Sequence, residues 1–236
     1  MLTAFTRAFK TPDLRRKLLF TLFIIVIFRL GSLVPVPGVS YSAVQECLRN
    51  ADATTGVLGL ANLFSGGALL QLSIFALGIM PYITASIIVQ LLTVVIPRFE
   101  ALKKEGQQGQ TKMTQYTGYL TIGLAILQSS TLITFAQNPQ SLFGATCTSI
   151  LPNDSVPTLV IMVLTMTAGT GVVMWLGELV TDKGIGNGMS ILIFTSIAST
   201  FPGSLWAIQQ QEGRWDLFIG IILMGFLVIA LVVFVE

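Results

Sequence analysis

Six apolar runs, each long enough to cross a lipid bilayer as a helix, constrain the fold of this 236-residue chain more than any other feature. A bilayer core about 30 Å thick requires roughly 20 apolar residues in a helix. Charged residues make up only 10% of the chain, whereas a soluble domain carries about 25%. We therefore predict an all-α, polytopic transmembrane helical bundle with spans at residues 18–34, 72–96, 116–135, 156–177, 189–208 and 217–235.

The distribution of lysine and arginine predicts the orientation of these spans, because such residues near span ends favour the cytoplasmic side. Ten of them lie before the first span and in the connections after the second and fourth spans, while the other connections carry only Arg49 and Arg214. The net charge of +2 is too small to indicate nucleic-acid recognition. We expect residues 1–17, 97–115 and 178–188 in the cytoplasm, and residues 35–71, 136–155 and 209–216 outside.

The first apolar run follows a basic stretch, and a secretory signal peptide has the same order of features. No small-residue cleavage site follows this run, and five further apolar runs come after it. We therefore interpret it as the first of the membrane spans.

Two irregularities are expected near the second span. Residues 57–71 are apolar but too short to cross the membrane, and Gly66 and Gly67 interrupt them. This pattern predicts a half-helix that is buried against protein or lines a cavity. Pro81 cannot donate a backbone hydrogen bond, so the helix should kink there, and Gly78 loosens the same turn.

The residue inventory argues against an enzyme. The chain has no histidine, and its two cysteines are too far apart to form a metal-ligand motif, so we expect neither a metal site nor a cofactor. The glycines of residues 184–188 lack the strand and the lysine of phosphate-binding loops, and we interpret them as a tight turn between two spans. Gly106 and Gly109, among lysines, indicate a flexible basic loop.

Arg29 is the one charged residue within the predicted spans. An arginine at the centre of a membrane helix costs about 2.5–3.5 kcal/mol on insertion scales. The short distance to Pro35 places Arg29 toward the outer interface, where its side chain can snorkel or bond backbone carbonyls. The predicted spans carry no aspartate or glutamate, which disfavours an ion-coupled transporter.

Cys47 and Cys147 lie in two loops that are both predicted to be outside. Disulfides persist on that side of a bacterial membrane, and two cysteines allow one internal pairing. The sequence leaves two outcomes open, a disulfide or two unpaired thiols, because it does not show whether the Cα atoms come close enough.

Five motifs follow one another along the chain: NLFSGGA at 62–68, FALGIMPYI at 75–83, KKEG at 103–106, WLGE at 175–178 and GIGNGMS at 184–190. Together they resemble the SecY family, the protein-conducting channels of the bacterial Sec translocon. The likeness runs over essentially the whole chain, and some segments are similar to actinobacterial members. The resemblance implies a channel subunit for protein translocation across, and insertion into, the cytoplasmic membrane. It implies SecE-like and SecG-like membrane subunits, a SecA motor or ribosome on the cytoplasmic side, and signal sequences and unfolded polypeptides as substrates.

The resemblance also implies roles for individual residues. Four residues match a ring of aliphatic side chains at the waist of the pore: Ile79, Ile83, Ile193 and Met189. Seven match a plug that blocks the resting channel, within residues 57–71: Asn62, Leu63, Phe64, Ser65, Gly66, Gly67 and Ala68. Thr84 and Gln128 match polar positions at a lateral gate toward lipid, although a polar residue bonded to helix backbone explains each of them equally.

Family members have ten spans in two halves, and this chain ends after its sixth. We therefore expect residues 18–208 to form the first half, and residues 209–236 to be an outer loop and the first span of a second half. Two alternatives stay open: a small-solute transporter or ion channel of another family, and a truncated fragment that does not conduct.

Overall fold

The structure is a computed structural model of the chain and describes residues 11–50, 62, 64–138, 150–210 and 215–235. The chain divides into two compact units, Met1–Ile197 and Ala198–Glu236. The regular structure of the described residues is helical, apart from one isolated antiparallel bridge between Pro35 and Ser73. The prediction of an all-α fold is therefore confirmed.

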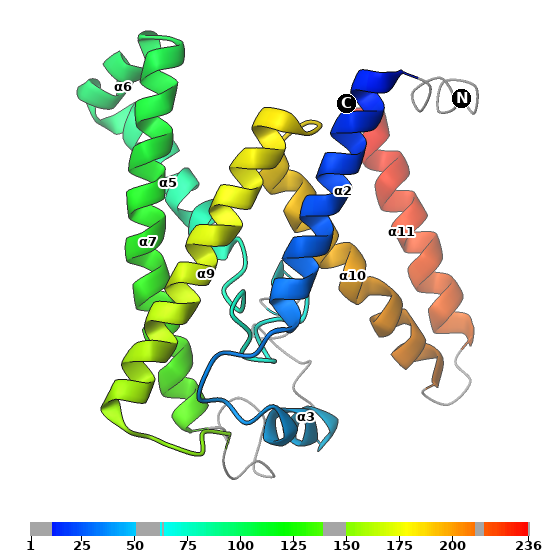
Figure 1. Ribbon diagram of the computed structural model, residues 1–236. Helices are drawn as coiled ribbons and strands as arrows, with labels where there is room; N and C mark the ends of the chain where they lie inside the picture. Colours follow the sequence, from blue (N-terminus) through cyan, green and yellow to red (C-terminus); the bar gives the residue numbers. More distant parts are fainter. Residues whose placement is uncertain (1–10, 51–61, 63, 139–149, 211–214, 236) are drawn as a thin grey trace. The chain divides into compact units, whose positions relative to one another are not determined.

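The first unit holds most of the helices, and the second holds the rest of α10 together with α11. Two long helices, α7 and α9, run side by side, α7 also packs against α5 and α6, and α9 also contacts α2 (Figure 1). The helices are α2 (Pro12–Leu33), α3 (Tyr41–Asn50), α5 (Met80–Val95), α6 (Pro97–Lys104), α7 (Gln107–Gln137), α9 (Val156–Lys183), α10 (Gly188–Gln210) and α11 (Trp215–Val235).

Each of the six predicted spans contains a helix. Among the described residues, α7 and α9 are each long and apolar enough to cross a membrane, and α5 with α6 would make a third span as a pair bent by 100°. Shorter apolar helices occupy Gly188–Thr200 and Leu223–Phe234. The prediction of helices that span a membrane is thus supported by their length and composition.

The second predicted span differs from the structure in its first eight residues. Residues 72–79 form turns instead of helix, and α5 begins only at Met80. The kink predicted at Pro81 is therefore wrong, because Pro81 lies in the first turn of α5. A backbone N–H has no helical partner in that turn, so a proline there starts a helix without bending it. Gly78, with φ of 54°, ends the turns that lead into the helix.

The connection at residues 97–115 is helical, whereas the sequence indicated a flexible loop. Only Glu105 and Gly106 separate α6 from α7, and Gly106 has a positive φ of 69°. The rings of Phe99 and Tyr116 meet edge to face, with centroids 5.6 Å apart, and the Leu102 carbonyl lies where a side chain on Gly109 would be. These contacts hold the two helices together, which explains why the segment is ordered.

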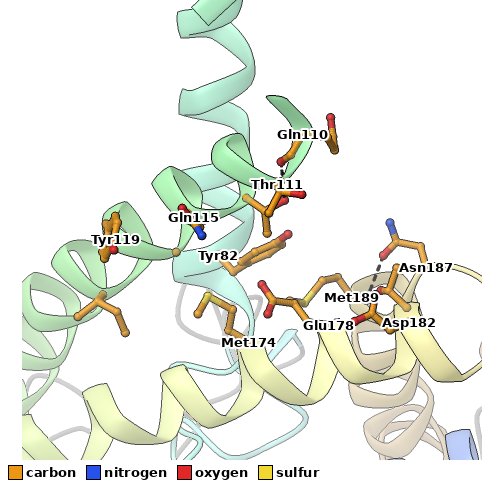
Figure 2. Close-up of a pocket in the computed structure, with 14 residues that line it drawn as sticks. Tyr82, Gln110, Thr111, Gln115, Tyr119, Met174, Glu178, Asp182, Asn187 and Met189 are labelled. Atoms are coloured by element: carbon orange, nitrogen blue, oxygen red, sulfur yellow. Dashed lines mark hydrogen bonds between the residues drawn. The ribbon is translucent and has the colours of Figure 1, made fainter. Parts of the chain in front are cut away.

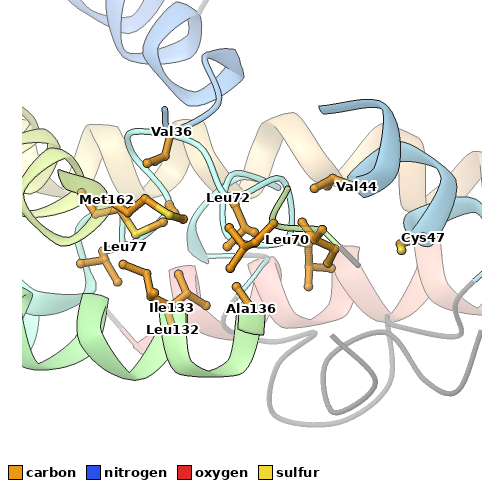
Figure 3. Packing of buried hydrophobic residues seen from close by; sticks show 14 of the residues in the cluster. Val36, Val44, Cys47, Leu70, Leu72, Leu77, Leu132, Ile133, Ala136 and Met162 are labelled. Carbon is orange, nitrogen blue, oxygen red and sulfur yellow. The ribbon is translucent and has the colours of Figure 1, made fainter. Parts of the chain in front are cut away.

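One apolar core anchors the turns that precede α5. Its buried members come from the connection after α2, from α3, from those turns, and from α7 and α9. Figure 3 shows Leu70, Leu72 and Leu77 from the turns beside Ile133 of α7 and Met162 of α9. Backbone bonds within the turns and to residues 34–36 replace the helical hydrogen bonds at residues 72–79, and burial of these side chains adds apolar packing.

Candidate functional site

The four residues that match the pore ring lie in one apolar cluster. Ile79 and Met189 are buried in it, with 2% and 8% of their surface exposed. Ile83 and Ile193 are partly buried and pack against the same cluster. These side chains come from the start of α5 and the start of α10, which are more than a hundred residues apart in the chain. The structure thus brings the predicted ring residues together, and their role as a seal stays a prediction.

The turn between α9 and α10 determines where Met189 lies. The backbone N–H of Gly188 donates to Thr181 Oγ1 at 2.9 Å, and the N–H of Met189 donates to Asn187 Oδ1 at 3.0 Å. A side chain on Gly188 would overlap the carbonyl oxygen of Gly177, and one on Gly177 would overlap the Met189 sulfur. The glycines of the 184–188 motif therefore allow α10 to start directly against α9, which agrees with the predicted tight turn.

A second part of the site is the turn segment, residues 62 and 64–79, which contains the described part of the predicted plug. Residues 57–61 and Leu63 of the plug prediction lie outside the described residues. The Ser65 hydroxyl donates to the Asn62 carbonyl at 3.0 Å and accepts the Leu69 N–H at 3.0 Å. Gly66 and Gly67 have φ of 68° and 87°. The segment is therefore a compact series of turns in which glycine provides the positive φ values.

The turn segment folds back onto the start of the apolar cluster. A β carbon placed on Gly78 would lie 3.4 Å from Cα of Ser65 and 3.7 Å from the carbonyl oxygen of Phe64. Gly78 immediately precedes Ile79, so the predicted plug packs next to one of the ring residues. The positive φ of 54° favours glycine at position 78, while these distances are ordinary van der Waals contacts.

Helix α2 is connected to both ends of the turn segment. Near residues 72–75, the N–H of Ile74 donates to the Val34 carbonyl at 2.9 Å, and Phe75 stacks on Phe28 with ring centroids 6.0 Å apart. Near the other end, Arg29 donates from its guanidinium to the Gly66 carbonyl at 2.8 Å. The prediction that Arg29 bonds a backbone carbonyl is confirmed. The role of Phe28 and Phe75 was not apparent from the sequence, where they are two aromatic residues among many apolar ones.

A cavity of about 840 Å³ lies between α5, α7, α9 and the start of α10. Figure 2 shows Tyr82 of α5 and Glu178 of α9 directed into the same space, with Met189 beside them. Asp182 adds a second carboxylate, and glutamine and threonine side chains of α7 line another wall. Met189 also belongs to the apolar cluster, and Tyr82 packs against it. The cavity therefore has polar walls and adjoins the predicted ring.

Sequence reasoning did not assign Tyr82, Glu178 or Asp182 to a site. The WLGE motif, which contains Glu178, was the available signal, but nothing in it indicated a shared cavity with α5 and α7. Among the described residues, no group of three or more histidine, cysteine, aspartate or glutamate side chains could hold a metal ion.

The remaining predicted residues are placed as follows. The Thr84 hydroxyl donates to the Met80 carbonyl of its own helix at 3.0 Å, and Gln128 is half-buried on α7, which packs against α5. Their assignment to a lateral gate stays a prediction. Cys47 is buried and disulfide-bonded, and Cys147 lies outside the described residues, so the pairing of these two also stays a prediction.

Membrane-length helices, turns buried among them and an apolar cluster beside a polar cavity define the class: a polytopic, all-α integral membrane protein. Within that class, the chain belongs to the SecY family, because the family model described as SecY matches residues 73–236. The chain is 62% identical to the protein translocase subunit SecY of Streptomyces scabiei, with all of this chain and 55% of that protein covered. It is 52% identical to the subunit of the same name from Mycobacterium tuberculosis (strain ATCC 25618 / H37Rv), with 54% of that protein covered.

These relatives agree with the actinobacterial resemblance in the sequence, and the chain spans about half the length of the curated relatives it matches. Two solved structures share the fold at 15% identity. One is described as "The structure of a protein conducting channel", with a TM-score of 0.61 over 94% of this chain and 47% of that chain. The other is Sec61 in the canine ribosome-channel complex from the endoplasmic reticulum, with a TM-score of 0.60 over 93% of this chain and 47% of that chain.

Proposed function

We propose that the chain forms the N-terminal part of a channel subunit for Sec-dependent protein translocation across, and insertion into, the bacterial cytoplasmic membrane. The observation that carries this proposal is the position of the apolar cluster. Ile79, Ile83, Met189 and Ile193 lie in or against that cluster, with the cavity adjoining it through Met189 and the turn segment adjoining Ile79. The cavity then corresponds to a vestibule, the apolar cluster to a seal and the turn segment to a plug.

The chemistry of the ring suits the passage of a polypeptide. Aliphatic side chains block ions by excluding water from a narrow constriction. They also make no specific hydrogen bonds that would retain a moving chain. Met189 is unbranched and flexible, so it can adapt to side chains of different size. The polar walls of the cavity offer hydrogen bonds to an incoming extended chain before it reaches the ring.

The cavity is proposed to face the cytoplasm. It is lined by residues from the start of α7 and the end of α9, which adjoin the two connections predicted to be cytoplasmic from their basic residues. On this side we place the partner that supplies the energy, a SecA motor or a ribosome, since the chain is proposed to work as a channel and not by its own chemistry. SecE-like and SecG-like subunits are proposed as membrane partners.

The role is tested by reconstituting the full-length protein that contains this sequence, together with a SecE-like subunit and a motor, in proteoliposomes. A secreted precursor should become protected from external protease, and protection should require the signal sequence. Failure of precursor transport, together with uptake of a small solute, would favour the alternative of a transporter. Residues 1–236 reconstituted in the same way test whether this portion conducts by itself.

A further inference from the structure

Arg29 places a permanent positive charge next to the predicted plug. Its guanidinium donates to the Gly66 carbonyl at 2.8 Å, across 37 positions of sequence. We propose that Arg29 is a positioning residue that holds residues 64–68 against Gly78 and Ile79, and thereby keeps the resting channel closed. This inference rests on the proposed function, and it assigns the control of closure to one residue of α2.

The two ends of the turn segment are held in different ways. At residues 72–75 the segment is fixed by the Pro35–Ser73 bridge, whose two backbone bonds run from the Ile74 N–H to the Val34 carbonyl and from the Val36 N–H to the Leu72 carbonyl, and by the stacking of Phe28 on Phe75. Gly31 adds to this anchor, because the Phe75 ring occupies the space that a side chain at position 31 would need. This end has several independent contacts, so removing one of them would leave the others in place.

The end that contains the predicted plug is held differently. Within the described residues, the hydrogen bonds of residues 62–70 join parts of the turn segment to one another, and the bond from Arg29 is the exception. Gly66 and Gly67 have positive φ values of 68° and 87°, so glycine gives the backbone freedom to turn at this point. Ala68 and Leu70 are buried here as well, so the Arg29 bond adds one directional contact to apolar packing, and breaking it leaves the anchored end intact.

The chemistry of the bond favours the closed position. A hydrogen bond from a charged donor is stronger than one between neutral groups. Arg29 lies in a predicted span, where a charge without a partner is costly. When the plug moves away, Gly66 no longer provides the acceptor, so opening must replace this bond with one to water, lipid or a passing polypeptide.

The experiment measures the resting ion leak of the full-length channel in planar bilayers, with the parent, Arg29→Met, a deletion of residues 62–68, and the combination of both changes. We expect Arg29→Met to raise the leak about tenfold, equivalent to about 1.4 kcal/mol in the closing equilibrium. In the deletion background, Arg29→Met should add nothing. Arg98→Met is the matched control, because Arg98 is exposed on α6, and its leak should equal that of the parent.

A second measurement follows the plug directly. Ala68, which is 1% exposed, is replaced by cysteine. The rate at which the Ala68→Cys thiol reacts with an impermeant maleimide is then measured in assembled, resting channels. Arg29→Met should speed this reaction, whereas Arg98→Met should not. If the deletion leaks but Arg29→Met neither leaks nor speeds the labelling, the inference is overturned. If the deletion itself does not leak, the plug assignment fails, and the labelling rate at Ala68→Cys still decides whether Arg29 holds the segment.

Discussion

The contact between α9 and α10 predicts that Gly188→Ala should destabilise the protein far more than Gly123→Ala in α7. A β carbon on Gly188 would overlap the Gly177 carbonyl oxygen and lie 2.8 Å from Cβ of Val180. Neither atom can move unless α9 itself shifts. Overpacking of a tight contact typically lowers the free energy of unfolding by about 1–3 kcal/mol. We expect a clash with backbone atoms to lower it by about 3 kcal/mol or more. For a folded unit of about 150–250 residues that corresponds to a melting temperature lower by roughly 6–12 °C, and the shift is smaller in a larger complex.

Two further glycines provide the comparison. In Gly177→Ala the new methyl group meets the Met189 sulfur and its terminal methyl, the flexible end of a side chain, so we expect a cost of about 1 kcal/mol and a displaced Met189. Gly123 in α7 has nothing within 4 Å of an added β carbon, and Gly123→Ala should be neutral or stabilise by up to about 1 kcal/mol. The assay is thermal unfolding of the purified full-length complex in detergent. A Gly188→Ala variant that melts at the same temperature as Gly123→Ala would refute the proposed contact.

Three other predictions concern topology, the ring and the cysteines. Cysteines introduced at Gln107 and Gln140 should react with an impermeant reagent from opposite sides of the membrane, and equal labelling from outside would overturn the orientation. Ile83→Ser should admit water to the constriction and raise the resting ion leak of the full-length channel. An unchanged conductance at normal expression would mean that Ile83 has only a packing role. Alkylation under denaturing, non-reducing conditions should leave Cys47 and Cys147 unmodified. Modification of both in protein taken straight from the membrane would refute their pairing.

Most of the helices could be predicted from the sequence, because a membrane-spanning helix requires a long apolar run. The start of α5 could not. Residues 72–79 are as apolar as the helix that follows, and apolar composition does not distinguish a buried turn from a helix. Pro81 fits both a kink and a helix start. The structure decides between them, because residues 74–79 form turns and Ile74 bonds the Val34 carbonyl outside any helix.

The candidate site was predictable in part. Ile79 and Ile83 are four residues apart, but that spacing is common to all packed helices. Met189 and Ile193 were assigned to the ring through the family resemblance alone. The cavity could not be predicted, since Tyr82, Glu178 and the α7 side chains belong to three helices whose packing determines that they share a space. Arg29 was recognised as costly within a span, and the structure supplied its partner, Gly66.

The central claim is that a translocating polypeptide passes through the ring formed by the starts of α5 and α10. It is tested most directly by placing a photoreactive amino acid at Ile83 in the full-length channel and irradiating it with a precursor stalled during translocation. The matched control is Val94, which is on the same helix and 83% exposed. We expect precursor adducts from position 83, dependent on the signal sequence and on energy, and none from position 94. Efficient translocation with no adduct at position 83, or with equal adducts at both positions, would contradict it.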